Sequence, residues 1–151
     1  MSEAQLALDA IITEAFILDI LAARHARDIF VPHCKTGPSW GGGAGPILDA
    51  WVMPRSWTKP IIGYEIKVSR QDFRRDHKWM SYLQYCNLFY FVVPWGLIHP
   101  AEVPPEAGLI WTTKTGRGLR WQVKAPSRWY LNIPQSIFQY VLMWRMDGME
   151  R

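Results

Sequence analysis

The sequence predicts a single α/β domain, and three observations lead to this class. The chain has 151 residues, the size of one ordinary domain. Hydrophobic residues make up 49% of it and charged residues 20%, which is enough apolar material for a packed core. Apolar residues recur at helical spacing near both ends and in short strand-like runs between them. No repeat, low-complexity tract or linker divides the chain, so we assign residues 1–151 to one domain.

The first half of the chain predicts a helix followed by three strands. Residues 4–25 form one amphipathic helix in this prediction, because apolar side chains recur there at helical spacing. Its expected buried stripe consists of Leu8, Ile11, Ile12, Ala15, Leu18 and Ala22. Strands are expected at residues 29–31, 47–53 and 61–68, the last two as an antiparallel hairpin. Five glycines in residues 35–45 predict a loop between the first two strands.

The second half predicts a helix, a strand, a hairpin and a closing helix. Ser69, with Asp72 three residues on, is typical of a helix start, and residues 76–78 are expected to bend or divide that helix. Residues 88–93 are continuously apolar, which predicts a strand covered on both faces. A hairpin is expected from residues 109–113 and 119–124, with Leu119, Trp121 and Val123 on one face of its return strand. A C-terminal helix follows Pro134.

No segment of the sequence is suited to crossing a membrane. The longest uncharged apolar stretch, residues 88–98, is interrupted by proline and glycine and is far shorter than the ~20 residues of a membrane helix. The N-terminus is acidic where a secretory signal would be basic, so we expect a soluble, cytoplasmic protein. Cys34 and Cys86 form no CxxC pair and are expected to be reduced, buried thiols.

Charge is unevenly distributed along the chain. The formal net charge is +4, yet residues 1–28 carry five acidic and two basic side chains. Residues 55–78 reverse this with seven basic against three acidic, and residues 111–128 carry five basic and none acidic. Tryptophans and other aromatics are interleaved with both basic segments. This pattern suits a surface that binds nucleic acid, although a solvated basic surface explains it equally well.

Four charged residues lie on elements that are otherwise apolar. Asp49 is in the middle of a predicted strand, on the face expected to hold Trp51. Glu65 and Lys67 are two apart in the next strand, so both side chains point to one face. Glu14 lies within or beside the buried stripe of the first helix. Burying a charge costs several kcal/mol unless it is compensated.

Two interpretations account for these buried charges. The first is a structural ion-pair cluster, which explains Glu65 with Lys67. It explains Asp49 and Glu14 less well, because one lysine does not neutralise three carboxylates. The second is a divalent cation site, since Mg²⁺ and Mn²⁺ prefer oxygen ligands. The spacing of His33 with Cys34, and of His77 with Cys86, does not indicate a soft metal site, so we interpret these as core or surface residues.

At this point the sequence resembles a known family. Asp49, followed by Glu65-Ile66-Lys67 at the end of a second strand, is similar to the motif of the PD-(D/E)XK phosphodiesterase superfamily. The longer string from Tyr64 to Phe73 resembles more narrowly the MmcB-like DNA repair endonucleases. Further matching positions are Asp76, Lys78, Trp79, Tyr82, Cys86 and residues 90–94. The resemblance covers about residues 10 to 130 and implies a restriction-endonuclease-like core, with a mixed central sheet flanked by helices and an added hairpin and C-terminal helix.

The resemblance implies a role for each residue of the centre. Asp49 and Glu65 would hold Mg²⁺, or Mn²⁺ as a substitute, with the backbone carbonyl of Ile66 as a further ligand. Lys67 would orient or deprotonate the attacking water and stabilise charge on the phosphate. Glu14 would bind a metal-coordinated water or a second ion.

Several residues near this motif are candidate DNA contacts. They are Arg70, Arg74, Arg75, Lys78, Tyr82 and Lys35. A solvated helix face explains the arginines equally well. Supporting roles are also open, with Asp72 capping the helix and Asp76 pairing with Arg75 or Lys78.

The leading hypothesis is a Mg²⁺-dependent deoxyribonuclease, an endonuclease in DNA repair or processing. Its partner would be DNA, and many such nucleases form homodimers to cut two strands. One alternative is a DNA-binding module of the same fold that does not cleave. Another is an assembly protein whose nine tryptophans form an interaction surface.

Overall fold

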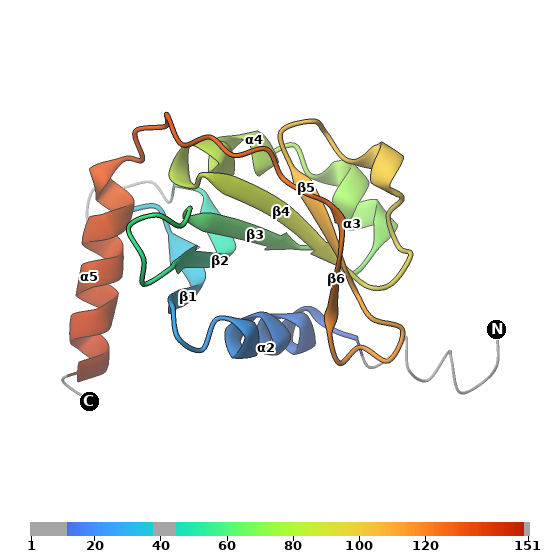
Figure 1. Ribbon diagram of the computed structural model, residues 1–151, viewed down its shortest axis with the longest axis horizontal. Coiled ribbons are helices and arrows are strands. Elements are labelled where there is room, and N and C mark those ends of the chain that lie inside the picture. The colour runs from blue at the N-terminus through green and yellow to red at the C-terminus, as the bar shows by residue number, and fades with distance from the viewer. Residues whose placement is uncertain (1–11, 38–44, 150–151) are drawn as a thin grey trace.

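The fold is built on one six-stranded mixed sheet. A computed structural model describes residues 12–37 and 45–149. The strands follow one another across the sheet in chain order, from β1 to β6 (Figure 1). They are β1 (Ile29–Lys35), β2 (Ile47–Met53), β3 (Ile62–Ile66), β4 (Leu88–Val93), β5 (Gly108–Thr112) and β6 (Leu119–Val123). Pairing is parallel from β3 to β5 and antiparallel elsewhere.

Helices cover both faces of this sheet. They are α2 (Glu14–Arg24), α3 (Arg70–Arg75), α4 (Trp79–Tyr82) and α5 (Gln135–Met149), with short 3₁₀ turns η1 (Leu83–Tyr85) and η2 (Pro100–Glu102). In Figure 1, α2 lies below the sheet and α3 and α4 lie above it, while α5 stands beside the first strands. The predicted α/β class, with a mixed sheet flanked by helices, is confirmed.

The apolar core has two parts, one on each face of the sheet. The α2-side core includes Ile17, Leu21, Ala50, Val52, Tyr64 and Ile66. The α4-side core includes Val31, Leu48, Trp51, Phe89, Phe91 and Ile137. Because β4 contributes alternate residues to both cores, this central strand is buried on both faces, as the continuous apolar run of residues 88–93 predicts.

Most of the predicted elements are confirmed. The bounds of β2 and β4 agree with the expected ranges, and β2 and β3 form the expected antiparallel pair. The Ser69 hydroxyl accepts a hydrogen bond from the Asp72 N–H, 3.1 Å long, and so caps α3. The helical region is divided after Arg75 as expected. Residues 4–11 and 38–44 of the predicted helix and loop lie outside the described residues.

Two predicted patterns are wrong. In α2 the fully buried side chains are Ile17 and Leu21, whereas Ala15 is exposed, so the buried stripe is rotated from the expected one. In β6 the pairing with β5 shifts register, and this irregularity breaks the alternation. Leu119 therefore packs in the α2-side core and Val123 in the α4-side core.

The first two strands share a kink where His33 faces Asp49. Pairing continues on either side of it, with Pro32 opposite Ala50 and Cys34 opposite Leu48. His33 has a φ of 47°, a left-handed conformation that few non-glycine residues adopt. The kink extends β1 to Lys35, beyond the predicted end of the strand, and delivers His33 to the edge of the sheet where the charged residues gather.

The kink also changes the expected faces of β2. Leu48 packs in the same core as Trp51, three residues later, whereas Ala50 packs in the other core. The prediction that Asp49 shares the face of Trp51 by simple alternation is therefore wrong. Asp49 lies within β2 at the kink and is only partly buried.

The start of α5 is fastened to the end of β1. The Ser136 hydroxyl donates a 2.7 Å hydrogen bond to the carbonyl oxygen of Thr36, one hundred positions away. A Cβ atom on Gly37 would lie 3.1 Å from the Cβ of Ser136, so the two segments are in close contact. Ile137 and Val141 then anchor α5 in the α4-side core.

Two expectations about the whole chain can be compared with the structure. Cys34 and Cys86 are both buried and reduced, as predicted, and burial raises the pKa of each thiol to about 12. Within residues 12–37 and 45–149, no helix combines the length and the apolar character that membrane crossing requires.

Candidate metal centre

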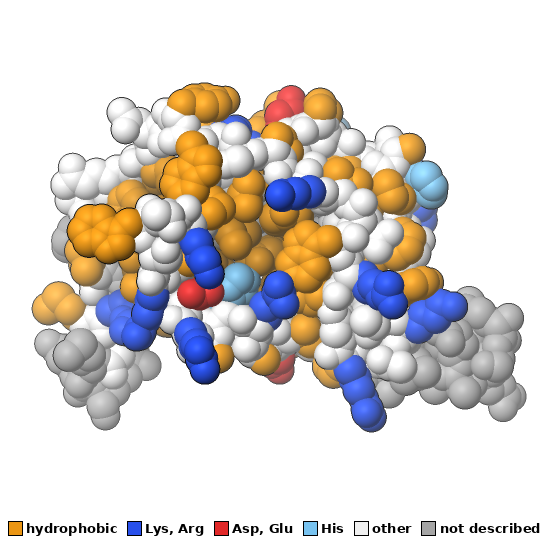
Figure 2. All heavy atoms as spheres, viewed as in Figure 1, with side chains coloured by type: hydrophobic (Ala, Val, Ile, Leu, Met, Phe, Trp, Pro, Cys, Tyr) orange, Lys and Arg blue, Asp and Glu red, His pale blue; other side chains and the backbone are white. Residues whose placement is uncertain are grey.

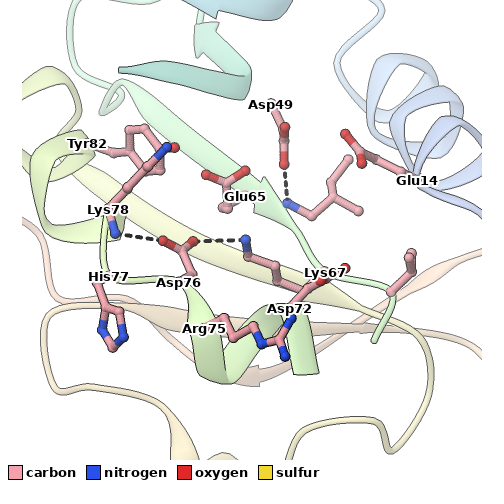
Figure 3. Close-up of a pocket in the computed structure, with 12 residues that line it drawn as sticks. Glu14, Asp49, Glu65, Lys67, Asp72, Arg75, Asp76, His77, Lys78 and Tyr82 are labelled. Atoms are coloured by element: carbon pink, nitrogen blue, oxygen red, sulfur yellow. Dashed lines mark hydrogen bonds and ion pairs between the residues drawn. The ribbon is translucent and has the colours of Figure 1, made fainter. Parts of the chain in front are cut away.

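The charged residues singled out above line one cleft at the C-terminal end of β3. The cleft has a volume of about 350 Å³ and is open to solvent (Figure 3). Its charged lining residues include Glu14, Asp49, Glu65, Lys67, Asp72, Arg75, Asp76 and Lys78. They come from α2, β2, β3 and the α3–α4 region, so helices on both faces of the sheet contribute to the site.

Glu65 and Lys67 point into the cleft because of the period-two geometry of β3. Tyr64 and Ile66 pack in the α2-side core, which turns the side chains between and after them to the other face. The Lys67 N–H donates a 3.0 Å hydrogen bond to the Val92 carbonyl, so the backbone remains extended beyond the end of the strand.

Glu65 is the most deeply buried charged group of the cleft. Only 5% of its surface is exposed, and its Oε2 atom is buried without a hydrogen-bond partner among the residues that the structure describes. Burial, followed by the neighbouring Asp49 carboxylate, raises the pKa of Glu65 to about 10. Without a metal ion beside it, this carboxyl group is therefore protonated at neutral pH.

Asp49 connects the kink of β2 to the end of β3. Its Oδ2 atom accepts a 2.7 Å hydrogen bond from the backbone N–H of Ile66 (Figure 3). This bond fixes the carboxylate beside Glu65, as the resemblance implies for the two principal ligands. Ile66 itself lines the cleft through its backbone segment.

Lys67 pairs with Asp76 and not with Glu65. Its Nζ atom lies 2.9 Å from Asp76 Oδ2, and both side chains are largely buried. The other Asp76 oxygen accepts the backbone N–H groups of Lys78 and Trp79, at 2.8 and 3.2 Å. The expectation that Asp76 pairs with the side chain of Arg75 or Lys78 is wrong. So is the interpretation of Glu65 with Lys67 as an ion pair, since the described salt bridges of Lys67 go to Asp76 alone.

Asp76 determines the charge state of the lysine. Burial lowers the pKa of Lys67, but hydrogen bonding and attraction to Asp76 outweigh it, and the pKa is raised above its usual value. Lys67 is consequently an ammonium group that Asp76 fixes in the cleft lining.

Glu14, which lines the cleft, and His33 both lie close to Asp49. Glu14 is the first residue of α2, beside the N-cap Thr13, and it is exposed instead of lying within a buried stripe. Burial, then repulsion from Asp49, raises its pKa. Potential ligand atoms of Glu14, His33 and Asp49 all lie within 4.8 Å of one another.

Sequence reasoning missed His33, although a signal was present. The predicted strand ended before Pro32, and His33 was interpreted with Cys34 as a core or surface residue. Extending that strand by two residues in an antiparallel pairing with β2 would have placed His33 opposite Asp49, which is where the structure has it.

The candidate DNA contacts separate into two groups. Arg75, Lys78 and Tyr82 line the cleft, and Tyr82 is largely buried. Burial, followed by the charge of Glu65, raises the pKa of the Tyr82 hydroxyl. Arg74 and Lys35 are exposed and lie outside the cleft lining.

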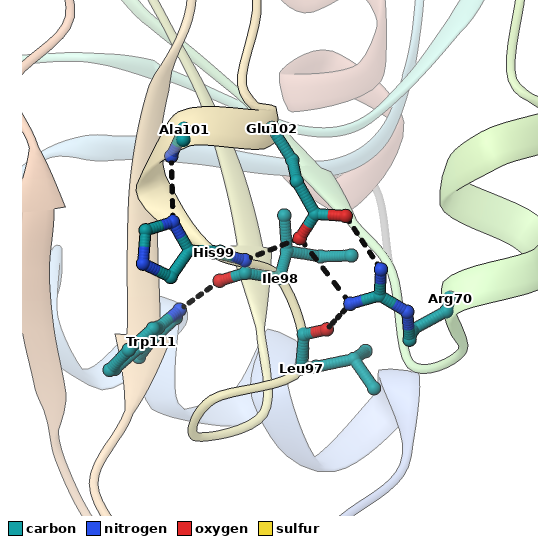
Figure 4. A network of polar contacts seen from close by, with 7 residues as sticks. All are labelled: Arg70, Leu97, Ile98, His99, Ala101, Glu102 and Trp111. Atoms are coloured by element: carbon teal, nitrogen blue, oxygen red, sulfur yellow. Dashed lines mark hydrogen bonds and ion pairs between the residues drawn. The ribbon is translucent and has the colours of Figure 1, made fainter.

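Arg70 is held by another part of the chain. Its guanidinium contacts both oxygens of Glu102, at 2.6 and 3.3 Å, and donates a 2.7 Å hydrogen bond to the Leu97 carbonyl (Figure 4). Glu102 also accepts the His99 N–H at 2.7 Å. This network fastens the start of α3 to the segment after β4, so Arg70 supports the structure near the cleft.

Basic side chains also extend well beyond the cleft. In Figure 2, Lys and Arg outnumber acidic side chains over the lower half of the visible face, around α2 and the β5–β6 hairpin. Some are paired with aromatics: the Arg24 guanidinium lies 4.4 Å from the centre of the Trp121 ring.

The donor set of the cleft fits a hard divalent cation. It offers carboxylate oxygens from three separate elements, one of them buried and without a hydrogen-bond partner. Buried polar atoms in proteins nearly always have partners, so an orphaned oxygen in a cleft requires an explanation such as an ion. Carboxylates with water and phosphate oxygens are what Mg²⁺ ordinarily binds.

Comparison with known proteins gives a family for the chain. A solved structure of a protein of unknown function from Silicibacter pomeroyi is similar, with a TM-score of 0.62 and 23% sequence identity over 89% of this chain and 82% of that chain, which shows a shared fold. No curated protein matches the sequence. The family model described as DNA repair protein MmcB-like matches residues 50–127, a segment that contains Glu65, Lys67 and Asp76. The chain therefore belongs to the MmcB-like family of DNA repair proteins.

Proposed function

We propose that this protein is a metal-dependent deoxyribonuclease of the PD-(D/E)XK type, which hydrolyses phosphodiester bonds of DNA as an endonuclease in repair or processing. Membership of a DNA repair family supports the substrate. The order of helix, three strands, helix and strand supports the superfamily.

One observation carries the proposal. Glu65 places a buried oxygen without a partner against the Asp49 carboxylate, at the mouth of a solvent-filled cleft. Two adjacent carboxylates repel each other, and burial makes the charged form of Glu65 more unfavourable still. A divalent cation removes both penalties, and Asp49, Glu65, Glu14 and the backbone carbonyl of Ile66 are the groups that would hold it.

The chain's own residues position the reactants. A bound Mg²⁺ supplies a Lewis acid and makes its water more acidic. The Ile66 N–H fixes the Asp49 carboxylate, and the core packing of Tyr64 and Ile66 fixes Glu65. Neither side chain needs to reorganise when a phosphate enters, which is the basis of electrostatic preorganisation.

Within this cleft, the ammonium group of Lys67 is suited to stabilise the negative charge that the phosphate gains during hydrolysis. Asp76 holds its ammonium group on the Glu65 side of the cleft, so Lys67 faces the space where the scissile phosphate would lie. There it would orient the attacking water and stabilise charge on the phosphoryl oxygens. Arg75 and Lys78, at the rim, would bind neighbouring phosphates of the same strand.

The direct test is cleavage of plasmid, linear and branched DNA by the purified protein with Mg²⁺ or Mn²⁺. Glu65→Ala and Lys67→Ala should each lower the rate by about 10²–10³-fold or more. Glu106→Gln removes an exposed carboxylate outside the cleft and is the matched control. Wild-type activity in the first two variants would exclude this site.

Cation binding is measured separately from cleavage. At a Mn²⁺ concentration of 100 times the dissociation constant, binding to the folded state adds about 2.7 kcal/mol of stability. For a chain of this size that corresponds to a rise in Tm of about 5–11 °C. Glu65→Ala should abolish the rise. Salt-sensitive DNA binding with neither a Tm rise nor cleavage would instead identify a DNA-binding module that does not cleave.

We extend the proposal to a homodimer when both strands are cut, because one centre acts on one strand at a time. Sedimentation velocity on DNA with Ca²⁺ in place of Mg²⁺ should then detect two copies of the chain on each duplex. A single copy that still makes double-strand breaks in one encounter would contradict the dimer and leave the hydrolytic proposal intact.

A further inference from the structure

We propose that His33 is a nitrogen ligand in this cleft, and that Glu14, His33 and Asp49 bind a divalent transition-metal ion of the Mn²⁺ or Co²⁺ class in preference to Mg²⁺. This inference rests on the proposed cation site. It specifies which class of ion the three ligands prefer. Neither the family match nor the PD-(D/E)XK resemblance assigns a role to this histidine.

Three different elements bring these ligand atoms together. Glu14 begins α2, His33 lies in β1 and Asp49 lies in β2. One ligand atom from each lies within 4.8 Å of the other two. With bond lengths of about 2.2 Å, ligands on opposite sides of an ion are about 4.4 Å apart and adjacent ligands about 3.1 Å apart. The three ligand atoms must therefore move closer together to bind one ion, and Glu14 and His33 are exposed, which leaves room for that movement and for an ion to enter.

The backbone delivers the imidazole to this position by an uncommon conformation. The φ of 47° at His33 turns the residue out of the regular alternation of β1, so that Val31 and Cys34, three apart, both pack in the α4-side core. The pairing with β2 resumes without a change of register, which leaves His33 facing Asp49 across the kink.

A second observation independently indicates a ligand at this place. Glu65 is more than nine-tenths buried, and its Oε2 atom has no hydrogen-bond partner. Figure 3 shows its carboxyl group directed toward Asp49 within the cleft. Asp49 therefore has the buried Oε2 atom of Glu65 on one side and the pair Glu14 and His33 on the other. In this position its carboxylate could bind an ion together with either group.

The donor chemistry decides the class of ion. Mg²⁺ requires near-ideal octahedral oxygen ligation and keeps its waters, whereas imidazole suits Zn²⁺ and the other first-row transition ions. Carboxylates alone suit Mg²⁺ and Mn²⁺ alike. Adding one imidazole nitrogen to two carboxylates therefore favours a transition-metal ion over Mg²⁺.

Pulsed EPR of Mn²⁺ bound to the full-length protein tests this directly, because a coordinated imidazole gives a nitrogen hyperfine coupling that carboxylates and water do not. Mn²⁺ is titrated to two equivalents, and the coupling is recorded for the wild type, His33→Asn and His77→Asn. Asparagine is the appropriate replacement at position 33 because it tolerates the left-handed conformation. His77 lines the same cleft but is not among the three clustered ligands, so His77→Asn is the matched control.

The expected result is a nitrogen coupling in the wild type and in His77→Asn that is absent from His33→Asn. Calorimetric titration should show Mn²⁺ binding weakened by about tenfold or more in His33→Asn, with Mg²⁺ binding changed much less. Circular dichroism at 222 nm and the Tm in EDTA show whether the variant remains folded.

Each other outcome has a definite meaning. Bound Mn²⁺ without a nitrogen coupling in the wild type would overturn the role of His33 and leave the cation site standing. A coupling that persists in His33→Asn would also overturn it, and loss in His77→Asn would move the ligand to that residue. No bound Mn²⁺ in the wild type would overturn both this inference and the proposed function.

Discussion

Two polar clusters lie on opposite faces of β3, and they differ in whether the protein satisfies them. On the α2 side, His25 contacts Asp28 at 2.9 Å through Nδ1 and the Tyr64 hydroxyl at 2.7 Å through Nε2. The Asp28 carboxylate also accepts the Arg55 N–H at 3.4 Å. On the other face, the cleft contains Glu65 with a buried oxygen that no described group satisfies.

The difference distinguishes a structural cluster from a functional one. Buried polar groups normally stabilise a fold only when they are hydrogen-bonded, and the His25 cluster meets this condition. Glu65 does not, because its buried Oε2 atom has no partner among the described residues, and the fold is less stable for holding this carboxyl group beside Asp49. A site that is incomplete without a ligand is the kind that a protein keeps for binding or catalysis.

Replacing Glu65 by Gln should separate activity from stability most clearly. We expect DNA cleavage to fall by about 10²–10³-fold, because a cation ligand is lost. Stability should respond in the opposite direction. The folded-state pKa of Glu65 is raised to about 10, so ionisation of the unfolded chain above pH 4.5 favours unfolding of the wild type.

Denaturant unfolding in EDTA at pH 4.5 and pH 7 measures this stability effect. The Glu65→Gln variant should match the wild type near pH 4.5 and become the more stable of the two as the pH rises to 7. A variant that is less stable at pH 7 would show that the protein itself satisfies Glu65.

The Lys67–Asp76 ion pair can be removed by changing Asp76, which leaves Lys67 itself in place. Asp76→Asn should lower kcat by about 10–100-fold, because Lys67 loses the group that positions it. The KM for DNA should change little, since Asp76 contacts Lys67 and the backbone of α4. Asp72→Asn, which changes a cleft carboxylate outside this pair, is the control. A change in KM alone would assign Asp76 to DNA binding.

The structural cluster should respond to mutation in the opposite way. Tyr64→Phe removes the hydroxyl that pairs with His25 and leaves a buried imidazole nitrogen without its partner. We expect the free energy of unfolding to fall by about 1–3 kcal/mol while cleavage per folded molecule stays unchanged. Urea titration and active-site-normalised rates measure the two effects. Loss of activity in a fully folded variant would link this cluster to catalysis.

The smallest effect concerns the pH dependence of the same cluster. Hydrogen bonding to His25 lowers the pKa of Asp28 below its usual value. The stabilisation is present above the unfolded-state pKa and is lost as the pH falls through the folded-state pKa. Asp28→Asn should therefore flatten the acid limb of the stability curve below pH 4. An unchanged limb would show that the pair contributes nothing to stability.

Sequence periodicity predicted the parts of the centre that lie on regular strands. The two-residue spacing of Glu65 and Lys67 was sufficient to place both in one space, because β3 is regular and its other face is apolar. The bounds of β2 and β4 followed from their apolar runs and the prolines and glycines around them.

The features that were missed depend on local irregularities. His33 reaches the cleft through a positive φ, which no pattern of hydrophobicity encodes. Asp76 meets Lys67 because the chain turns between α3 and α4, and loop geometry decides where that carboxylate points. The register shift in β6 reversed the face of Val123 in the same way. Regular helices and strands can be predicted from the periodicity of the sequence. The positions of kinks, turns and bulges depend on three-dimensional packing, which that periodicity does not describe.

The hydrogen bond from Ser136 to Thr36 has a consequence for how the protein is made. The strand that carries His33 receives this anchor only from α5, a helix encoded near the end of the chain. During translation, residue 136 must therefore leave the ribosome before that edge of the sheet is fastened. A nascent chain interrupted before residue 136 would lack the bond, so the strand that carries His33 is fastened only after the start of α5 has been made.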